Sequence, residues 1–195
     1  MITVKINGEE RQYPQGATYE DVANDYQKEY DNLIALAARD GKIRELFKKL
    51  TRDCEITFFT LKDDVGNKTY VRSATMLFLK AVFDVFGRET VQNCRVEFAI
   101  GNGSYISPKG KINATEENAA KIRNRMRELV EAKTPFLKRS YSLDNAMELF
   151  RREGMKDKEK LFRYRRGSFV NIYEMDGYYD YYYGYMLPNA GYLKW

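Results

Sequence analysis

The chain opens with ITVKINGEERQY at residues 2–13, and this stretch predicts how the first part folds. Apolar residues occupy every second position from Ile2 to Ile6, the pattern of a half-buried β-strand. Asn7-Gly8 is a preferred two-residue hairpin turn, because both residues adopt positive φ at low cost. A returning strand over residues 10–13 ends at Pro14. The sequence therefore predicts a β-hairpin at the start of the chain.

One helix and three more strands are expected after this hairpin. Thr18 is a good N-cap with an acidic residue three positions later, so a helix begins there. Strands are predicted at 33–37, after the Asp40-Gly41 turn, and at 55–61. The order β-β-α-β-β-β, with one helix crossing a mixed sheet, predicts a ubiquitin-like β-grasp domain over residues 1–61.

A second, α+β domain is predicted over residues 68–195, after a polar linker at 62–67. We expect a mainly antiparallel sheet flanked by helices. Gly101-Asn102-Gly103 is interpreted as a turn, and the last residues, 191–195, as part of a strand. The expected helices cover 69–86, 115–133 and 142–154, and the strands cover 95–100, 104–107, 136–141 and 168–175, with a return strand from 178.

The chain contains no histidine, which restricts its chemistry. Histidine titrates near neutral pH and is the commonest zinc ligand, so its absence removes the ordinary route to general-base or metal-assisted hydrolysis. Cys54 and Cys94 are interpreted as two reduced thiols. Without an apolar run long enough to span a bilayer or a signal peptide, we expect a cytoplasmic protein with no membrane partner.

The chain has a net charge of +5. The segment from Arg151 to Arg166 has a local excess of the same size, because eight of its residues are basic and three are acidic. Such a patch attracts phosphates, and a solvated helix face explains it equally well. RNA or nucleotide binding and a solvated surface therefore both remain open. The candidate binding residues are Arg151, Arg152, Lys156, Lys160, Arg163, Arg165 and Arg166.

A tyrosine-rich run extends from Tyr178 to Tyr185. Aromatic side chains next to basic residues can stack on bases, but alternation along a strand would place half of them in a core. We favour core and interface packing. Asp176 and Asp180 are interpreted as ordinary surface carboxylates.

By its motifs, the chain resembles the amino-terminal half of threonyl-tRNA synthetase, a TGS domain followed by the editing-type domain shared with alanyl-tRNA synthetase. The similarity covers the whole chain. The segments that carry it are the junction Thr60-Leu61-Lys62-Asp63, Ser73 to Leu77, Phe98 to Ile106, and Gly177-Tyr178-Tyr179-Asp180 through Pro188-Asn189.

The resemblance implies a site that this chain has lost. In the family, two histidines four residues apart on a helix and a cysteine and a histidine near the end form a zinc-type cluster. The matching positions are Arg72, Met76, Tyr182 and Met186. None of these side chains handles protons near neutral pH, so we expect no catalytic residue and no metal. Arg72 could pair with an anion above an apolar floor, or the cleft could be filled by packed side chains.

A similar pair of domains precedes the kinase domain of bacterial uridine kinase-like nucleoside kinases. The resemblance therefore implies a non-catalytic accessory module of such a kinase, with ATP and Mg belonging to the kinase domain and no cofactor in this segment. The alternative is the N-terminal region of a threonyl-tRNA synthetase-like protein with an inactivated editing site. The expected partners are tRNA, RNA or a nucleotide, and the kinase domain itself.

Overall fold

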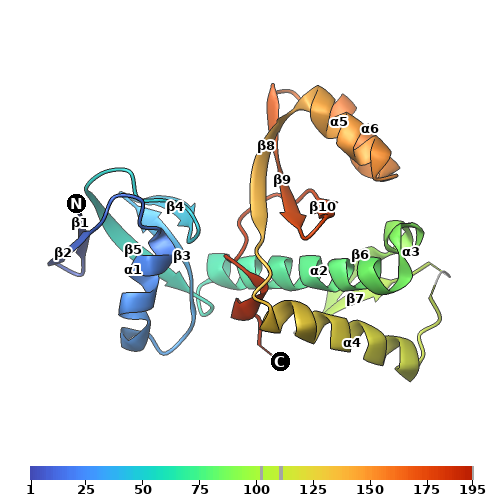
Figure 1. Ribbon diagram of the computed structural model, residues 1–195, viewed down its shortest axis with the longest axis horizontal. Coiled ribbons are helices and arrows are strands. Elements are labelled where there is room, and N and C mark those ends of the chain that lie inside the picture. Colours follow the sequence, from blue (N-terminus) through green and yellow to red (C-terminus); the bar gives the residue numbers. More distant parts are fainter. Residues whose placement is uncertain (102, 110–111, 195) are drawn as a thin grey trace. The chain divides into compact units, whose positions relative to one another are not determined.

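The computed structural model describes residues 1–101, 103–109 and 112–194, and the chain divides into two compact units (Figure 1). One unit combines Met1–Ala74 with the residues from Tyr183 onward, and the other is Thr75–Tyr182. Helix α2 (Asp64–Phe86) contributes its first half to one unit and its second half to the other. The fold is α+β, with mainly antiparallel strand pairing.

The first unit contains a five-stranded sheet with the order β2-β1-β5-β3-β4. Strands β1 and β5 pair in parallel, and the other neighbours pair antiparallel. This is the element order predicted from the sequence, and the assignment to a β-grasp domain stays a prediction. The elements are β1 (Ile2–Ile6), β2 (Glu9–Tyr13), α1 (Tyr19–Tyr26), η1 (Gln27–Glu29), β3 (Ile34–Arg39), β4 (Lys42–Glu45) and β5 (Cys54–Thr60).

Helix α1 begins at a capping box, as the sequence predicted. The Thr18 hydroxyl accepts from the Asp21 amide, and the Asp21 carboxylate accepts from the Thr18 amide at 2.7 Å. These bonds satisfy amides that the first helical turn leaves without a partner. The opposite face of α1 buries Tyr19, Val22 and Tyr26 in the core of the sheet.

The predicted linker at 62–67 is wrong in its second part, because α2 already begins at Asp64. The Asp63 carboxylate accepts from the amide of Thr60 at 2.7 Å, which joins the end of β5 to the start of the helix. At Gly66 the helix touches this junction: a Cβ there would lie 2.0 Å from the Thr60 carbonyl oxygen. The junction is therefore a tight, fixed connection.

The C-terminal residues pack within the first unit. The Tyr192 hydroxyl donates to Glu20 at 2.8 Å, and the Leu187 amide donates to the Ser73 hydroxyl at 3.0 Å. The strand expected at 191–195 is wrong for its described part, since Ala190–Tyr192 form the 3-10 helix η2; Trp195 lies outside the described residues. Whether 1–61 and 68–195 are separate domains by descent stays a prediction.

The second unit has two small sheets, whereas the sequence predicted one. Strands β8, β9 and β10 form one antiparallel sheet, and β6 and β7 form a separate hairpin among the described residues. Asn102, in the predicted turn of that hairpin, lies outside them. The elements are α3 (Arg88–Asn93), β6 (Arg95–Ile100), β7 (Gly103–Ser107), α4 (Glu116–Glu131), β8 (Leu137–Ser142), α5 (Leu143–Arg152), α6 (Lys156–Arg163), β9 (Phe169–Met175) and β10 (Tyr178–Asp180).

A buried lysine connects three elements of the second unit. Lys80 on α2 donates to Asp84 at 2.7 Å and to the Asp176 carbonyl, in the β9–β10 turn, at 2.6 Å. Arg125 on α4 binds the other oxygen of Asp84 at 2.8 Å, and α4 runs beside α2 in Figure 1. Because every charge here has a partner, the network fixes the α2 side of the unit.

In the described part of the chain, no helix is long and apolar enough to cross a membrane.

The Thr60–Gly66 contact predicts an unusual result for Gly66→Ala. Alanine normally stabilises a helix by about 1 kcal/mol relative to glycine, but here its methyl group would overlap a backbone carbonyl. We expect the free energy of unfolding to fall by roughly 2 kcal/mol in urea denaturation. The neighbouring exposed substitution Asn67→Ala is the control and should leave it unchanged or slightly raised. A stabilised Gly66→Ala variant would contradict the described junction.

Candidate functional site

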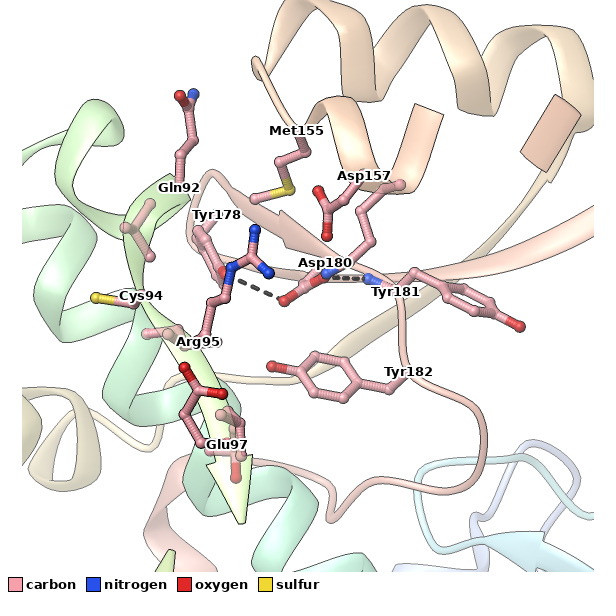
Figure 2. Close-up of a pocket in the computed structure, with 15 residues that line it drawn as sticks. Gln92, Cys94, Arg95, Glu97, Met155, Asp157, Tyr178, Asp180, Tyr181 and Tyr182 are labelled. Carbon is pink, nitrogen blue, oxygen red and sulfur yellow. Dashed lines mark hydrogen bonds and ion pairs between the residues drawn. The ribbon is translucent and has the colours of Figure 1, made fainter. Parts of the chain in front are cut away.

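A pocket of about 400 Å³ lies within the second unit. It is lined by the second half of α2, the end of α3, strand β6, the start of α6, and the residues from Tyr178 to Tyr182 (Figure 2). Clefts of this size bind small molecules or the ends of larger ones. In Figure 2, Arg95 and the ring of Tyr182 point into the space around Asp180. The pocket is therefore the candidate functional site.

An ion pair between Lys158 and Asp180 forms the polar centre of this pocket. The Lys158 ammonium lies 2.6 Å from Oδ1 of Asp180, whose side chain is only 5% exposed. The same carboxylate accepts from the Tyr181 amide at 2.6 Å and from the Tyr178 hydroxyl at 3.2 Å. A buried carboxylate with three donors is held in one orientation.

The protonation states follow from these contacts. Burial disfavours the charged form of Lys158, but the attraction and hydrogen bond of Asp180 outweigh burial and raise the pKa of Lys158 above its ordinary value of 10.5. Burial, followed by the charge of Asp180, raises the pKa of Tyr178 well above 10.0. Burial also raises the pKa of the Cys94 thiol. At neutral pH Lys158 is therefore a cation, and Tyr178 and Cys94 keep their protons.

These states favour binding over proton transfer. The lining includes the cations Arg95 and Lys158 together with the carboxylates Glu97, Asp157 and Asp180, so Arg95 and the paired Lys158 can attract only a part of a ligand that is anionic or electron-rich. The Tyr182 ring, which points into the pocket in Figure 2, can pack against a planar group. Among the described residues, no group of three or more histidine, cysteine or carboxylate side chains could hold a metal ion.

The four predicted positions of the lost editing site fall into both units. Arg72 and Met186 belong to the first unit, and Met76 and Tyr182 to the second, so their meeting in one cleft stays a prediction. Both methionine side chains are fully buried. The Arg72 guanidinium donates to the Tyr185 carbonyl at 2.6 Å and lies against Gly184, where a Cβ would approach it to 2.6 Å. Arg72 is thus engaged by the backbone of its own unit.

The tyrosine run behaves only partly as predicted. Strand β10 ends at Asp180, so the expected alternation along a strand is wrong beyond that residue. Tyr178 is buried in the core, as favoured, and Tyr181 packs its edge on Phe162 with ring centroids 5.0 Å apart. Tyr183, by contrast, is 87% exposed.

The candidate basic residues lie on α5, on α6 and just after α6. Arg151 and Arg163 both bind Glu159, at 3.0 and 3.1 Å, and Arg152 binds Glu153 at 3.4 Å. Arg165 is half-buried and contacts the Tyr181 hydroxyl. The other three are exposed and form no ion pair with described residues: Lys156, Lys160 and Arg166.

Sequence reasoning missed the centre of the pocket. Asp180 was interpreted as a surface carboxylate, but its side chain is buried, so that interpretation is wrong. Lys158 was counted only as part of the basic surface, yet it points inward to Asp180. A usable signal was the acidic residue within the aromatic run, because a carboxylate surrounded by tyrosines needs a cationic partner.

Comparison with known proteins places the chain near one class of enzyme, the threonine–tRNA ligases. It is 29% identical over 198 residues to the threonine–tRNA ligase of Thermotoga maritima, a match that covers 99% of this chain and 30% of the ligase. The ligase of Maricaulis maris is 28% identical over 193 residues, and that of Carboxydothermus hydrogenoformans is 26% identical over 205. No protein-family profile matches the chain.

The chain spans about 30% of the length of these relatives. They support the alternative drawn from the sequence, a threonyl-tRNA synthetase-like region, better than an accessory module of a uridine kinase-like enzyme. The kinase parent has no support from them, and the TGS assignment stays a prediction.

The Lys158–Asp180 pair predicts strong energetic coupling. Asp180→Asn leaves the lysine without its anion, and Lys158→Met removes one donor from a buried carboxylate. Each substitution should lower the free energy of unfolding by about 2 kcal/mol at pH 7, and the double variant should cost at least about 1 kcal/mol less than the sum. Urea denaturation of the four proteins measures this coupling.

The coupling should also depend on pH in a defined direction. Because the folded pKa of Lys158 is raised, the pair stabilises the fold at neutral pH, and this contribution is lost only as pH rises beyond 10.5. Additive single substitutions at pH 7 would show that the two side chains do not form the pair.

Proposed function

We propose that this chain is the threonyl-tRNA synthetase-like region of a larger protein, and that its pocket binds the acceptor end of tRNA without hydrolysing the aminoacyl ester. The observation that carries the proposal is a polar, tyrosine-lined pocket in a chain that has no histidine. The pocket contains cationic and aromatic side chains that can bind a ligand. At the four positions matched to the family site, however, the chain lacks the histidine and cysteine side chains that would transfer protons.

The chemistry of an acceptor end suits this pocket. A terminal adenosine has a planar base, a ribose with hydroxyl groups, and a phosphate on its 5′ side. Tyr182 supplies aromatic surface, Arg95 supplies positive charge, and Lys158 adds a cation that is paired with Asp180. The Glu97 and Asp157 carboxylates in the lining can accept hydrogen bonds from the ribose hydroxyl groups. Asp180 is already satisfied by three donors, which leaves its role as holding Lys158 in place.

The proposal extends the similarity to threonine–tRNA ligases into a binding role. The match with those enzymes covers nearly all of this chain, which supports tRNA as the partner. The predicted inactivation is supported by Met76 and Met186, which are fully buried and cannot exchange protons.

One experiment separates binding from hydrolysis. The chain is incubated with mischarged aminoacyl-tRNA, and both ester loss and complex formation are measured. We expect ester loss at the uncatalysed rate, together with binding that weakens steeply as salt is raised from about 50 mM, since phosphate contacts release counterions.

Matched lysine variants provide the control for that experiment. Lys158→Met, assayed where urea denaturation shows that the variant is folded, should weaken binding about tenfold or more, because it removes one of the two pocket cations, whereas Lys42→Met removes an exposed lysine of the first unit and should change affinity by less than about twofold. Ester hydrolysis above background, or no complex at about 50 mM salt, would contradict the proposal.

A further inference from the structure

The segment from Lys160 to Phe169 presents exposed aromatic and basic side chains together. Tyr164 is 80% exposed and Phe169 is 66% exposed. Lys160 and Arg166 are also exposed, and neither forms an ion pair with any residue the structure describes. We call these four residues the α6–β9 surface. Two exposed aromatic rings and two exposed cations within one segment of ten residues have the composition of a surface that binds another molecule.

The backbone that carries this surface is well anchored. Phe162, inside the segment, is buried between Phe150 and Tyr181, with centroid distances of 5.5 and 5.0 Å. The Arg165 amide donates to the Phe162 carbonyl at 3.2 Å, and its guanidinium contacts the Tyr181 hydroxyl. Tyr164 therefore projects from a fixed turn at the end of α6, which reduces the entropy lost when a partner binds.

The Phe169 end is fixed as well. Phe169 is the first residue of β9 and pairs with Ser142 of β8. The carbonyl of Ser168 accepts from the Leu143 amide at 3.2 Å, which holds the chain where it enters the sheet. Both aromatic rings thus stand on ordered backbone and face outward.

We propose that the α6–β9 surface binds a short single-stranded segment of RNA, with bases stacked on Tyr164 and Phe169 and phosphates held by Lys160 and Arg166. The charge selects a polyanion, and the two exposed rings select one whose bases are accessible. A duplex offers phosphates but hides its bases, so it would use only the two cations.

The choice of RNA rests on the proposed function, but this surface does not need the pocket to be occupied. Lys158 faces the pocket from α6, whereas Lys160 on the same helix is exposed. A strand on this surface is therefore held by side chains different from those that bind an acceptor end. The two ideas can fail separately.

The test measures affinity for a ten-nucleotide oligouridylate and for an RNA duplex of the same length. The chain should bind the single strand more tightly. Tyr164→Ser and Phe169→Thr should each weaken single-strand binding about tenfold, with little effect on the duplex, because each removes one stacking contact. The exposed tyrosine variant Tyr183→Ser is the matched control and should bind normally.

The two cations, Lys160 and Arg166, should affect how binding depends on salt. Lys160→Ala and Arg166→Ala should each reduce the slope of log affinity against log salt by about 0.7 for the single strand, whereas the aromatic variants should leave that slope unchanged. The urea midpoint of every variant is measured, and all should match the wild type, because the four side chains are exposed. If the urea midpoint of Phe169→Thr is lowered, the inference is judged from the single-strand affinity of Tyr164→Ser alone.

The outcomes are unambiguous. Equal affinity for single strand and duplex, unchanged binding by Tyr164→Ser, or binding through these residues to anionic phospholipid vesicles and not to RNA would overturn the inference. Loss of acceptor-end binding with normal oligouridylate binding would instead contradict the proposed function and leave this surface intact.

Discussion

The second unit depends on the ion pair between Lys158 and Asp180. These residues are 22 positions apart, and their 2.6 Å contact joins the start of α6 to the end of β10. Two further donors fix the carboxylate, so the pair sets the position of α6 as well as the polar centre of the pocket. With α6 held this way, its inner side supplies the pocket with a cation and its outer side exposes basic residues to solvent.

Under the proposed function, the same constraint would allow binding to be kept after catalysis is lost. A buried ion pair satisfied by hydrogen bonds is costly to break, so the pocket keeps its shape for reasons of stability. Proton transfer needs groups that titrate near neutral pH, and such groups can be replaced without disturbing the pair. Met76 and Met186 occupy buried positions where packing alone suffices. The proposal of binding without hydrolysis follows from these two properties.

Local signals in the sequence predicted much of the fold. The Asn7-Gly8 turn and the Thr18 cap act through neighbouring residues, and both appear in the structure. Helices α3 and α6 were missed because they are short and start without a side-chain cap. The division into two sheets depends on contacts between distant residues, and no local pattern encodes it. The position of Asp180 within a tyrosine run hinted at its burial, but its partner Lys158 lies 22 positions away and could not be read from that run.

The most direct test is to map the binding of a hydrolysis-resistant aminoacyl-adenosine amide onto the chain by NMR. The account predicts saturable chemical-shift changes centred on Lys158, Tyr181 and Arg95, with the β1–β5 sheet unaffected. No saturation at millimolar ligand, or changes confined to residues outside the pocket, would contradict the claim that this chain retains a binding pocket for an acceptor end.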